Sequence, residues 1–125
     1  MQQAVRKYLT ALEAGDADKA AALFTPDGWV QSPFLGRVSV RDYVAKVASA
    51  SSRAKLTVHD VLVSAEGHLR AVGYYLYDWW LKDGSNVSFE CADVFNFDPD
   101  SGRIASIVLV YDTHLIRDVV AKKYP

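Results

Sequence analysis

The chain has little cysteine, no run of basic residues and no long apolar stretch. Its single cysteine, Cys91, excludes a disulfide within the chain and fits a reducing compartment. A net charge of −1 without a basic cluster argues against nucleic acid and against an anionic membrane as partners. No apolar stretch is as long as a membrane span, and the N-terminus lacks the charged and apolar regions of a signal peptide. We therefore expect a cytoplasmic protein.

Several motifs of catalysis and cofactor binding are also missing. The sequence has no glycine-rich phosphate loop, and its histidines do not stand at metal-ligand spacing from cysteine or carboxylate residues. No serine stands in a pattern that would supply it with a histidine base. We therefore expect no cofactor and no metal, and any chemistry would depend on carboxyl and hydroxyl groups.

Length and composition fit one compact domain over residues 1–125. With half of its residues hydrophobic and 12% aromatic, a chain of 125 residues can bury roughly two thirds of its unfolded surface around a single core. We expect no second domain.

The stretch from Tyr74 to Asp112 organises the rest of the chain, because it predicts three consecutive antiparallel strands. In the middle strand, the odd positions from Val87 to Phe97 are apolar except for Asp93, which is the period of a half-buried strand. A carboxyl group on that side must find a partner, lose its charge or face a cavity, because an unpaired buried charge is costly. Asp93 is therefore the first candidate functional residue.

The turns on either side of the middle strand decide which other carboxyl groups share its apolar face. Asp83-Gly84 predicts a two-residue hairpin turn, and that register directs Asp78 to the face that holds Asp93. The second turn leaves two alternatives open. A loop of four residues directs Asp112 to the same face, and a loop of five residues directs it away.

Three helices are predicted in the first half of the chain. Apolar residues recur at helical spacing from Val5 to Leu12, and Gly15 is a stop signal. Asp16 can cap a second short helix that runs through Phe24, and Ser39 begins a capping box for a third. A terminal helix is expected from Leu115 to Lys122.

Helices followed by mainly antiparallel strands predict an α+β fold. Short strands are expected over residues 29–32 and 56–63, and a long one over residues 68–81. Three N-terminal helices against one face of a curved sheet can enclose a cone-shaped cavity. The long strand is apolar on both faces, with Tyr75, Tyr77 and Trp79 opposite Asp78, so we expect a homodimer that covers this second face.

Four short segments along the chain carry a family resemblance. They are Tyr8–Asp16, Ala22–Phe24 with Asp27, Asp93–Phe95 and Gly102–Ile104. Together they resemble the nuclear-transport-factor-2-like superfamily, with its SnoaL-like and ketosteroid-isomerase-like cone barrels. The resemblance runs over nearly the whole chain and implies a small-molecule pocket. The superfamily includes isomerases, dehydratases, epoxide hydrolases, polyketide cyclases and non-catalytic binders.

The ketosteroid isomerase pattern implies an oxyanion hole. It places Tyr8 at the position of the family's oxyanion-hole tyrosine and Asp93 at that of its neutral, hydrogen-bond-donating aspartate. Ser32 stands where this family has its catalytic base.

The limonene-epoxide-hydrolase-like pattern implies a different set of residues. It places Asp78 and Asp112 at the two carboxylates of an Asp-Arg-Asp triad. Leu76 stands at the position of the arginine, and Ser32 lies near the position of an asparagine that holds the water.

The leading hypothesis is a cofactor-independent acid/base enzyme of isomerase, dehydratase, cyclase or hydrolase type that acts on a hydrophobic substrate. Asp93 with Tyr8 would donate to a developing oxyanion, and Asp78, or Asp112 with His114, would act as the base. The predicted substrate-binding residues are Ser32, Trp29, Trp80, Tyr74, Phe95 and Cys91. The alternative is a ligand-binding or dimerisation module of the same fold without chemistry.

Overall fold

The structure, a computed structural model, describes residues 1–114 and 117. The helices within these residues are α1 (Gln2–Ala14), α2 (Ala17–Ala22) and α3 (Val40–Ala50). The strands are β1 (Phe24–Ser32), β2 (Gly36–Ser39), β3 (Ser51–Val63), β4 (Arg70–Leu81), β5 (Asn86–Phe97) and β6 (Ile104–Val110). The terminal helix predicted from Leu115 to Lys122 lies outside the described residues, apart from residue 117.

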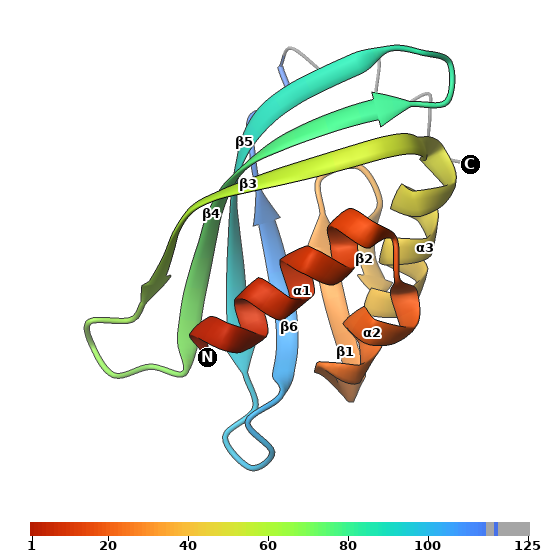
Figure 1. Ribbon diagram of the computed structural model, residues 1–125. Helices are drawn as coiled ribbons and strands as arrows, with labels where there is room; N and C mark the ends of the chain where they lie inside the picture. The colour runs from red at the N-terminus through yellow and green to blue at the C-terminus, as the bar shows by residue number, and fades with distance from the viewer. Residues whose placement is uncertain (115–116, 118–125) are drawn as a thin grey trace.

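The strands form one open, curved sheet, and the helices pack against one of its faces (Figure 1). The strand order is β2-β1-β6-β5-β4-β3. β1 and β6 run parallel, and all other neighbours in this sheet run antiparallel. The predicted α+β class with a mainly antiparallel curved sheet is confirmed. None of the described helices is long and apolar enough to cross a membrane.

Local capping signals define the end of α1 and the starts of α2 and α3 as predicted, whereas α2 ends at Ala22 and Phe24, predicted to be helical, begins β1. Gly15 ends α1 in a left-handed conformation with a φ of 67°, and its N–H bonds back to the carbonyl groups of the last turn. The Asp16 carboxylate accepts a hydrogen bond from the Lys19 N–H at 3.0 Å and so begins α2. The Ser39 hydroxyl accepts one from the Asp42 N–H at 3.1 Å and begins α3. Each cap satisfies backbone groups that would otherwise lack partners.

The turn between β4 and β5 differs from the prediction by one position. The Leu81 N–H donates to the Ser85 carbonyl at 2.8 Å, so Leu81 faces Ser85 and the loop has three residues. Gly84 closes this loop with a φ of 88°, the left-handed conformation that a three-residue hairpin loop requires at its last position. The two-residue turn predicted from Asp83-Gly84 is therefore wrong.

A shift of one residue exchanges the two faces of β4. Asp93 pairs with Gly73, so the odd-numbered side chains of β4 share its face and the even-numbered ones face away. The prediction that Asp78 points into the interior is therefore wrong. The odd-numbered face does not need a partner subunit, because α1 covers it through Val5 and Leu9, which lie against Gly73.

The end of β6 resolves the direction of Asp112. Asp93 pairs with Leu109, which is 7% exposed and shares its side of the sheet. Tyr111 continues on this inner side, whereas Asp112 is exposed. The Asp112 carboxylate accepts a hydrogen bond from the His114 N–H at 2.9 Å, a local turn contact at the surface.

The N-terminal part of the sheet is larger than the sequence predicts. β1 begins at Phe24 rather than at Trp29, and its second half pairs with the additional strand β2, with Trp29 opposite Ser39. The same strand pairs with β6 along its other edge. Val30 and Ser32 of β1 are buried and complete the inner face of the sheet beside β6.

Candidate functional site

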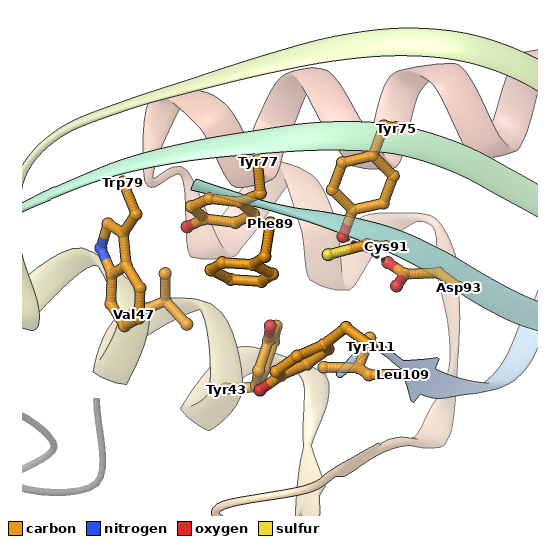
Figure 2. A pocket seen from close by; sticks show the side chains of 10 residues that line it. All are labelled: Tyr43, Val47, Tyr75, Tyr77, Trp79, Phe89, Cys91, Asp93, Leu109 and Tyr111. Carbon is orange, nitrogen blue, oxygen red and sulfur yellow. Dashed lines mark hydrogen bonds between the residues drawn. The ribbon is translucent and has the colours of Figure 1, made fainter. Parts of the chain in front are cut away.

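The inner face of β4 and β5 holds a small pocket that α3 and the end of β6 close (Figure 2). It is lined by Tyr43, Val47, Tyr75, Tyr77, Trp79, Phe89, Cys91, Asp93, Leu109 and Tyr111. The space that the centre of a water molecule can reach is about 10 Å³, which is enough for one water. The interior of the cone is therefore almost filled by aromatic side chains.

Asp93 is the buried carboxyl group of this pocket. Its exposed fraction is 0%, and its Oδ2 accepts a hydrogen bond of 2.8 Å from the Tyr75 hydroxyl (Figure 2). The other oxygen, Oδ1, is buried and has no hydrogen-bond partner among the described residues. Burial raises the pKa of Asp93 from 3.8 to about 7, although the Tyr75 hydrogen bond opposes this shift. Near neutral pH the group exists in both protonation states.

The neighbours of Asp93 remain protonated. Burial, followed by the charge of Asp93, raises the pKa of Tyr75 well above its ordinary value. The same two causes raise the pKa of the Cys91 thiol well above its ordinary value. Cys91 therefore lacks the low pKa that a nucleophilic thiolate needs, and it contributes an apolar wall. The titratable group that can change charge here near neutral pH is Asp93.

Aromatic rings form the wall between Asp93 and the open end of the pocket. Tyr77 and Phe89 stack with ring centroids 5.4 Å apart and planes 5° apart, and Phe89 and Tyr111 lie 4.9 Å apart. Phe89 and Tyr111 are only half-buried, which places them at the open end. An aromatic ring of a ligand could stack against the offset rings of this wall.

Trp79 is held in place by a hydrogen-bonded chain that links three elements. Its Nε1–H donates to the Ser51 hydroxyl, and that hydroxyl donates to the Val47 carbonyl at the end of α3. Because Ser51 is the first residue of β3, the chain joins α3, β3 and β4. The indole is thereby fixed as one wall of the pocket.

The comparison with known protein families decides the family of this chain. The sequence profile of the SnoaL-like domain matches residues 5–107. The chain belongs to the SnoaL-like domain family. The predicted nuclear-transport-factor-2-like superfamily is thereby confirmed. No curated protein sequence matches the chain.

Solved structures share the fold of this SnoaL-like domain at low sequence identity. A protein with a ketosteroid isomerase-like fold from Catenulispora acidiphila, in complex with trimethylamine, has a TM-score of 0.75 and 13% identity over 87% of this chain and 85% of its own. TerC, co-crystallised with polyporic acid, has a TM-score of 0.77 and 12% identity over 94% and 95%. TsrD from Streptomyces laurentii has a TM-score of 0.75 and 21% identity over 96% and 94%. Identities this low show the fold alone.

Two of the residues predicted for the site, Asp93 and Cys91, line the pocket of the SnoaL-like domain. Tyr8 and Phe95 lie in the core beside it, fully buried, with ring centroids 5.6 Å apart. Tyr8, predicted to donate to the ligand together with Asp93, is absent from the pocket lining, and the hydroxyl that donates to Asp93 Oδ2 belongs to Tyr75. Tyr8 is still close enough to contribute to the raised pKa of Tyr75.

The three groups predicted as bases lie outside the pocket. Asp78 is on the outer face of the sheet and accepts a hydrogen bond of 2.5 Å from the Ser88 hydroxyl. Asp112 and His114 are exposed beyond the end of β6. The expectation that two carboxyl groups share one cavity is therefore wrong, and the described pocket holds one carboxyl group.

The remaining predicted binding residues have structural contacts instead. Ser32 is buried, and its hydroxyl accepts hydrogen bonds from two N–H groups of the following turn, each at 3.3 Å. Trp29 lies under the Arg37 guanidinium at 3.6 Å, and Trp80 under that of Arg53 at 4.6 Å. Tyr74 is 41% exposed on the outer face. None of these four side chains lines the described pocket.

Sequence reasoning missed three residues of the pocket wall, Tyr75, Tyr77 and Trp79, for one physical reason. The odd-numbered residues of β4 were assigned to the wrong face by the register error, and with them Tyr75, the hydrogen-bond partner of Asp93. The signal that could have found them is Gly84, because a glycine three residues after Leu81 also fits a three-residue loop. Tyr43 and Tyr111 join the pocket through tertiary packing that has no local signal.

The described residues offer no metal site. No three His, Cys, Asp or Glu side chains among them lie close enough together to bind a metal ion. The described pocket itself offers one carboxyl group, tyrosine hydroxyls and aromatic rings.

Proposed function

We propose that this SnoaL-like domain binds a hydrophobic, ring-containing small molecule in the pocket of Figure 2 and moves a proton on it through Asp93, without a cofactor. The observation that carries the proposal is the buried Asp93 carboxyl group. Tyr75 holds one of its oxygens at 2.8 Å, and the other oxygen is buried without a partner in the described part of the chain.

A single carboxyl group of this kind can act both as base and as acid. Because the pKa of Asp93 is about 7, the carboxylate and the carboxylic acid are both populated near neutral pH. The carboxylate can take a proton from a carbon atom of the ligand, and the resulting acid can return that proton to another atom. The Tyr75 hydroxyl fixes the carboxyl group during both steps. Such a proton shift corresponds to an isomerisation or a cyclisation.

The one-carboxyl site favours these reactions over hydrolysis. Hydrolysis of an epoxide would need one group to activate water and a second to protonate the leaving oxygen. Asp78 and Asp112, the expected pair for that reaction, both lie outside the pocket. Two neighbours of the same fold were crystallised with small organic molecules, which supports small-molecule binding as the general role.

The test is hydrogen exchange on a carbon acid with an aromatic ring. 2-Tetralone in deuterated buffer reports proton removal directly, because NMR follows the loss of its acidic C–H signals. We expect the protein to accelerate this exchange in a saturable way. Asp93→Asn should lower the acceleration by about 100-fold or more, which is the usual contribution of a general base.

The matched control is Asp78→Asn, which removes a carboxyl group from the outer face of β4, the strand next to that of Asp93. This variant should exchange 2-tetralone like the wild type. If Asp93→Asn is folded and equally active, Asp93 is not the base. Saturable binding of 2-tetralone without any exchange would instead support the alternative function, a non-catalytic ligand-binding module.

The alternative has its own supporting observation. The pocket leaves room for about one water, and its remaining volume is filled by side chains. A ligand must therefore displace the half-buried Phe89 and Tyr111 before it reaches Asp93. A module that only binds ligand would use the same movement and show no exchange.

We also propose that the protein forms a homodimer, with the outer face of the sheet as the contact. This face carries the even-numbered side chains of β4 and β5 and, on β6, those of Val108 and Val110; Tyr74 and Val110 are exposed. Apolar side chains on an exposed sheet face gain free energy when a second copy covers them. A cytoplasmic location stays a prediction from the sequence.

A further inference from the structure

We infer that the pocket selects ligands whose polar head is an organic ammonium group, placed against the Oδ1 atom of Asp93. The inference deepens the proposed function, since it names the chemical class that the same pocket would take. It rests on the charges, the free volume and the aromatic rings around Asp93.

The charges around Asp93 favour a cation. None of the ten lining residues is Lys, Arg or His. The titratable groups that face Asp93 come from α1, α3, β4, β5 and the end of β6, and they are Tyr8, Tyr43, Tyr75, Tyr77, Cys91 and Tyr111. All of them are neutral when protonated, so among the described lining residues the ionised Asp93 is a negative charge without a positive neighbour. An anionic ligand would meet repulsion, whereas an ammonium group would supply the missing countercharge.

The hydrogen-bonding state of Asp93 favours a donor. Oδ2 is already used by the Tyr75 hydroxyl, and the buried Oδ1 has no partner among the residues that the structure describes. A buried carboxylate oxygen without a partner is costly, and a donor on the ligand removes that cost. An ammonium N–H makes a charge-assisted hydrogen bond there, which is stronger than one from a neutral hydroxyl.

The small free volume and the aromatic rings of the pocket restrict the shape of the ligand. A primary ammonium head is close to the size of the single water that the pocket can hold. Its carbon chain would extend past Phe89 and Tyr111 toward the open end. The aromatic faces along this route attract a nearby cation. The best ligands should therefore be primary amines with an apolar tail or ring.

Three probes with one ring and different heads test the inference: benzylammonium, benzyl alcohol and benzoate. At about pH 8, where Asp93 is ionised, we expect benzylammonium to bind about tenfold more tightly than benzyl alcohol. Benzoate should bind more weakly than either. Isothermal titration calorimetry measures the dissociation constants, and the indole N–H signal of Trp79 reports binding in the pocket.

The pH dependence gives an independent readout. Below the pKa of Asp93 the carboxyl group is protonated and cannot pair with a cation, so benzylammonium should bind more weakly at about pH 5.5 than at pH 8. Benzoate should show the opposite trend, and benzyl alcohol little change. Asp93→Asn should abolish the preference for the amine, whereas Asp78→Asn should retain it.

A second measurement covers the case in which Asp93→Asn fails to fold. In the wild-type protein, benzylammonium should lower the pKa of Asp93, as followed by carbon-13 NMR of its carboxyl carbon. Equal affinity for the amine and the alcohol at about pH 8, or an amine affinity that does not change with pH, would overturn the inference. The proposed function is tested separately, because Asp93-dependent exchange of 2-tetralone would persist in that case.

Discussion

Asp93 couples the stability of the fold to pH, because burial changes its pKa. In the unfolded chain its carboxyl group titrates near 3.8, and in the folded protein near 7. Between these values the folded protein holds a proton that the unfolded chain has released. The stability that Asp93 contributes is therefore full below pH 3.8 and is lost as the pH rises toward 7.

The first prediction concerns the slope of the free energy of unfolding against pH. From the lower to the upper pKa, the linkage corresponds to a loss of about 4 kcal/mol in the free energy of unfolding. Urea unfolding at several pH values between these limits should show the loss for the wild type. Asp93→Asn, which has no titrating group there, should show a correspondingly smaller slope.

Asp78→Asn is the control, since this carboxyl group lies on the outer face. It should keep the slope of the wild type. Equal slopes for the wild type and Asp93→Asn would mean that Asp93 is not the titrating group.

Among the secondary-structure elements, the hairpin of β4 and β5 decides which side chains reach the pocket. Its loop is fixed by Gly84 at a φ of 88° and by Asp83, whose Oδ1 accepts hydrogen bonds from the N–H and hydroxyl of Ser85. This loop sets the pairing of Asp93 with Gly73. A slip of one position would turn Tyr75 away from Asp93.

The second prediction tests the role of Gly84 in the loop. Apart from Gly84 itself and its two chain neighbours, no heavy atom of the described residues lies within 4 Å of a Cβ built at this position, so a substitution there changes mainly the backbone energy. Gly84→Ala should lower the free energy of unfolding by about 1–2 kcal/mol, because L-residues other than Asn and Asp are disfavoured in the left-handed region.

Gly84→Asn is the matched variant, because asparagine tolerates that conformation better. It should cost less than Gly84→Ala when both are measured by urea unfolding. A stabilised Gly84→Ala protein would show that the loop adopts another conformation.

The helices could be predicted from the sequence, whereas the strand register could not. Gly15, Asp16 and Ser39 act on backbone groups within four residues, so their effect is visible in the sequence itself. Asp83-Gly84 is compatible with loops of two and of three residues, and the two choices place opposite faces of β4 inward. Local pattern therefore identifies the strands and leaves their faces undecided.

The sequence predicted only those residues of the candidate site whose position follows from the pattern of a single strand. Asp93 was found because a charged residue stood among apolar odd positions of its own strand. Tyr43 and Tyr111 come from α3 and from beyond β6, and they reach the pocket only once the sheet has curved. Their positions depend on contacts between distant segments, which a single sequence does not display.

In the molecule as a whole, the two faces of the sheet have different surroundings. The inner face is covered by the helices, and in the described chain no helix covers the outer face (Figure 1). Apolar side chains of the outer face include Val72, Tyr74, Leu76, Trp80, Val94, Val108 and Val110. An apolar sheet face of this kind is typical of a contact between subunits.

The third prediction concerns the proposed homodimer. Light scattering during size-exclusion chromatography should give the mass of two chains for the wild type. Tyr74→Glu places a charge in the middle of the outer face and should raise the dissociation constant of the dimer by more than about tenfold.

Lys19→Glu is the control for added negative charge, because Lys19 is exposed on α2, which lies on the opposite side of the sheet from the outer face (Figure 1). This variant should remain dimeric. A monomeric wild type, or a Tyr74→Glu protein that dimerises as before, would contradict the proposed contact.

The parallel pairing of β1 with β6 also has a consequence for the order in which the protein can fold. Phe24 pairs with Ile104, so an early segment finds its neighbour near the other end of the described chain. Bringing such distant segments together costs more chain entropy than closing a hairpin, and contacts of this kind slow folding. During synthesis β1 cannot join the sheet until β6 has left the ribosome, whereas the hairpin of β1 with β2 and that of β4 with β5 can form earlier.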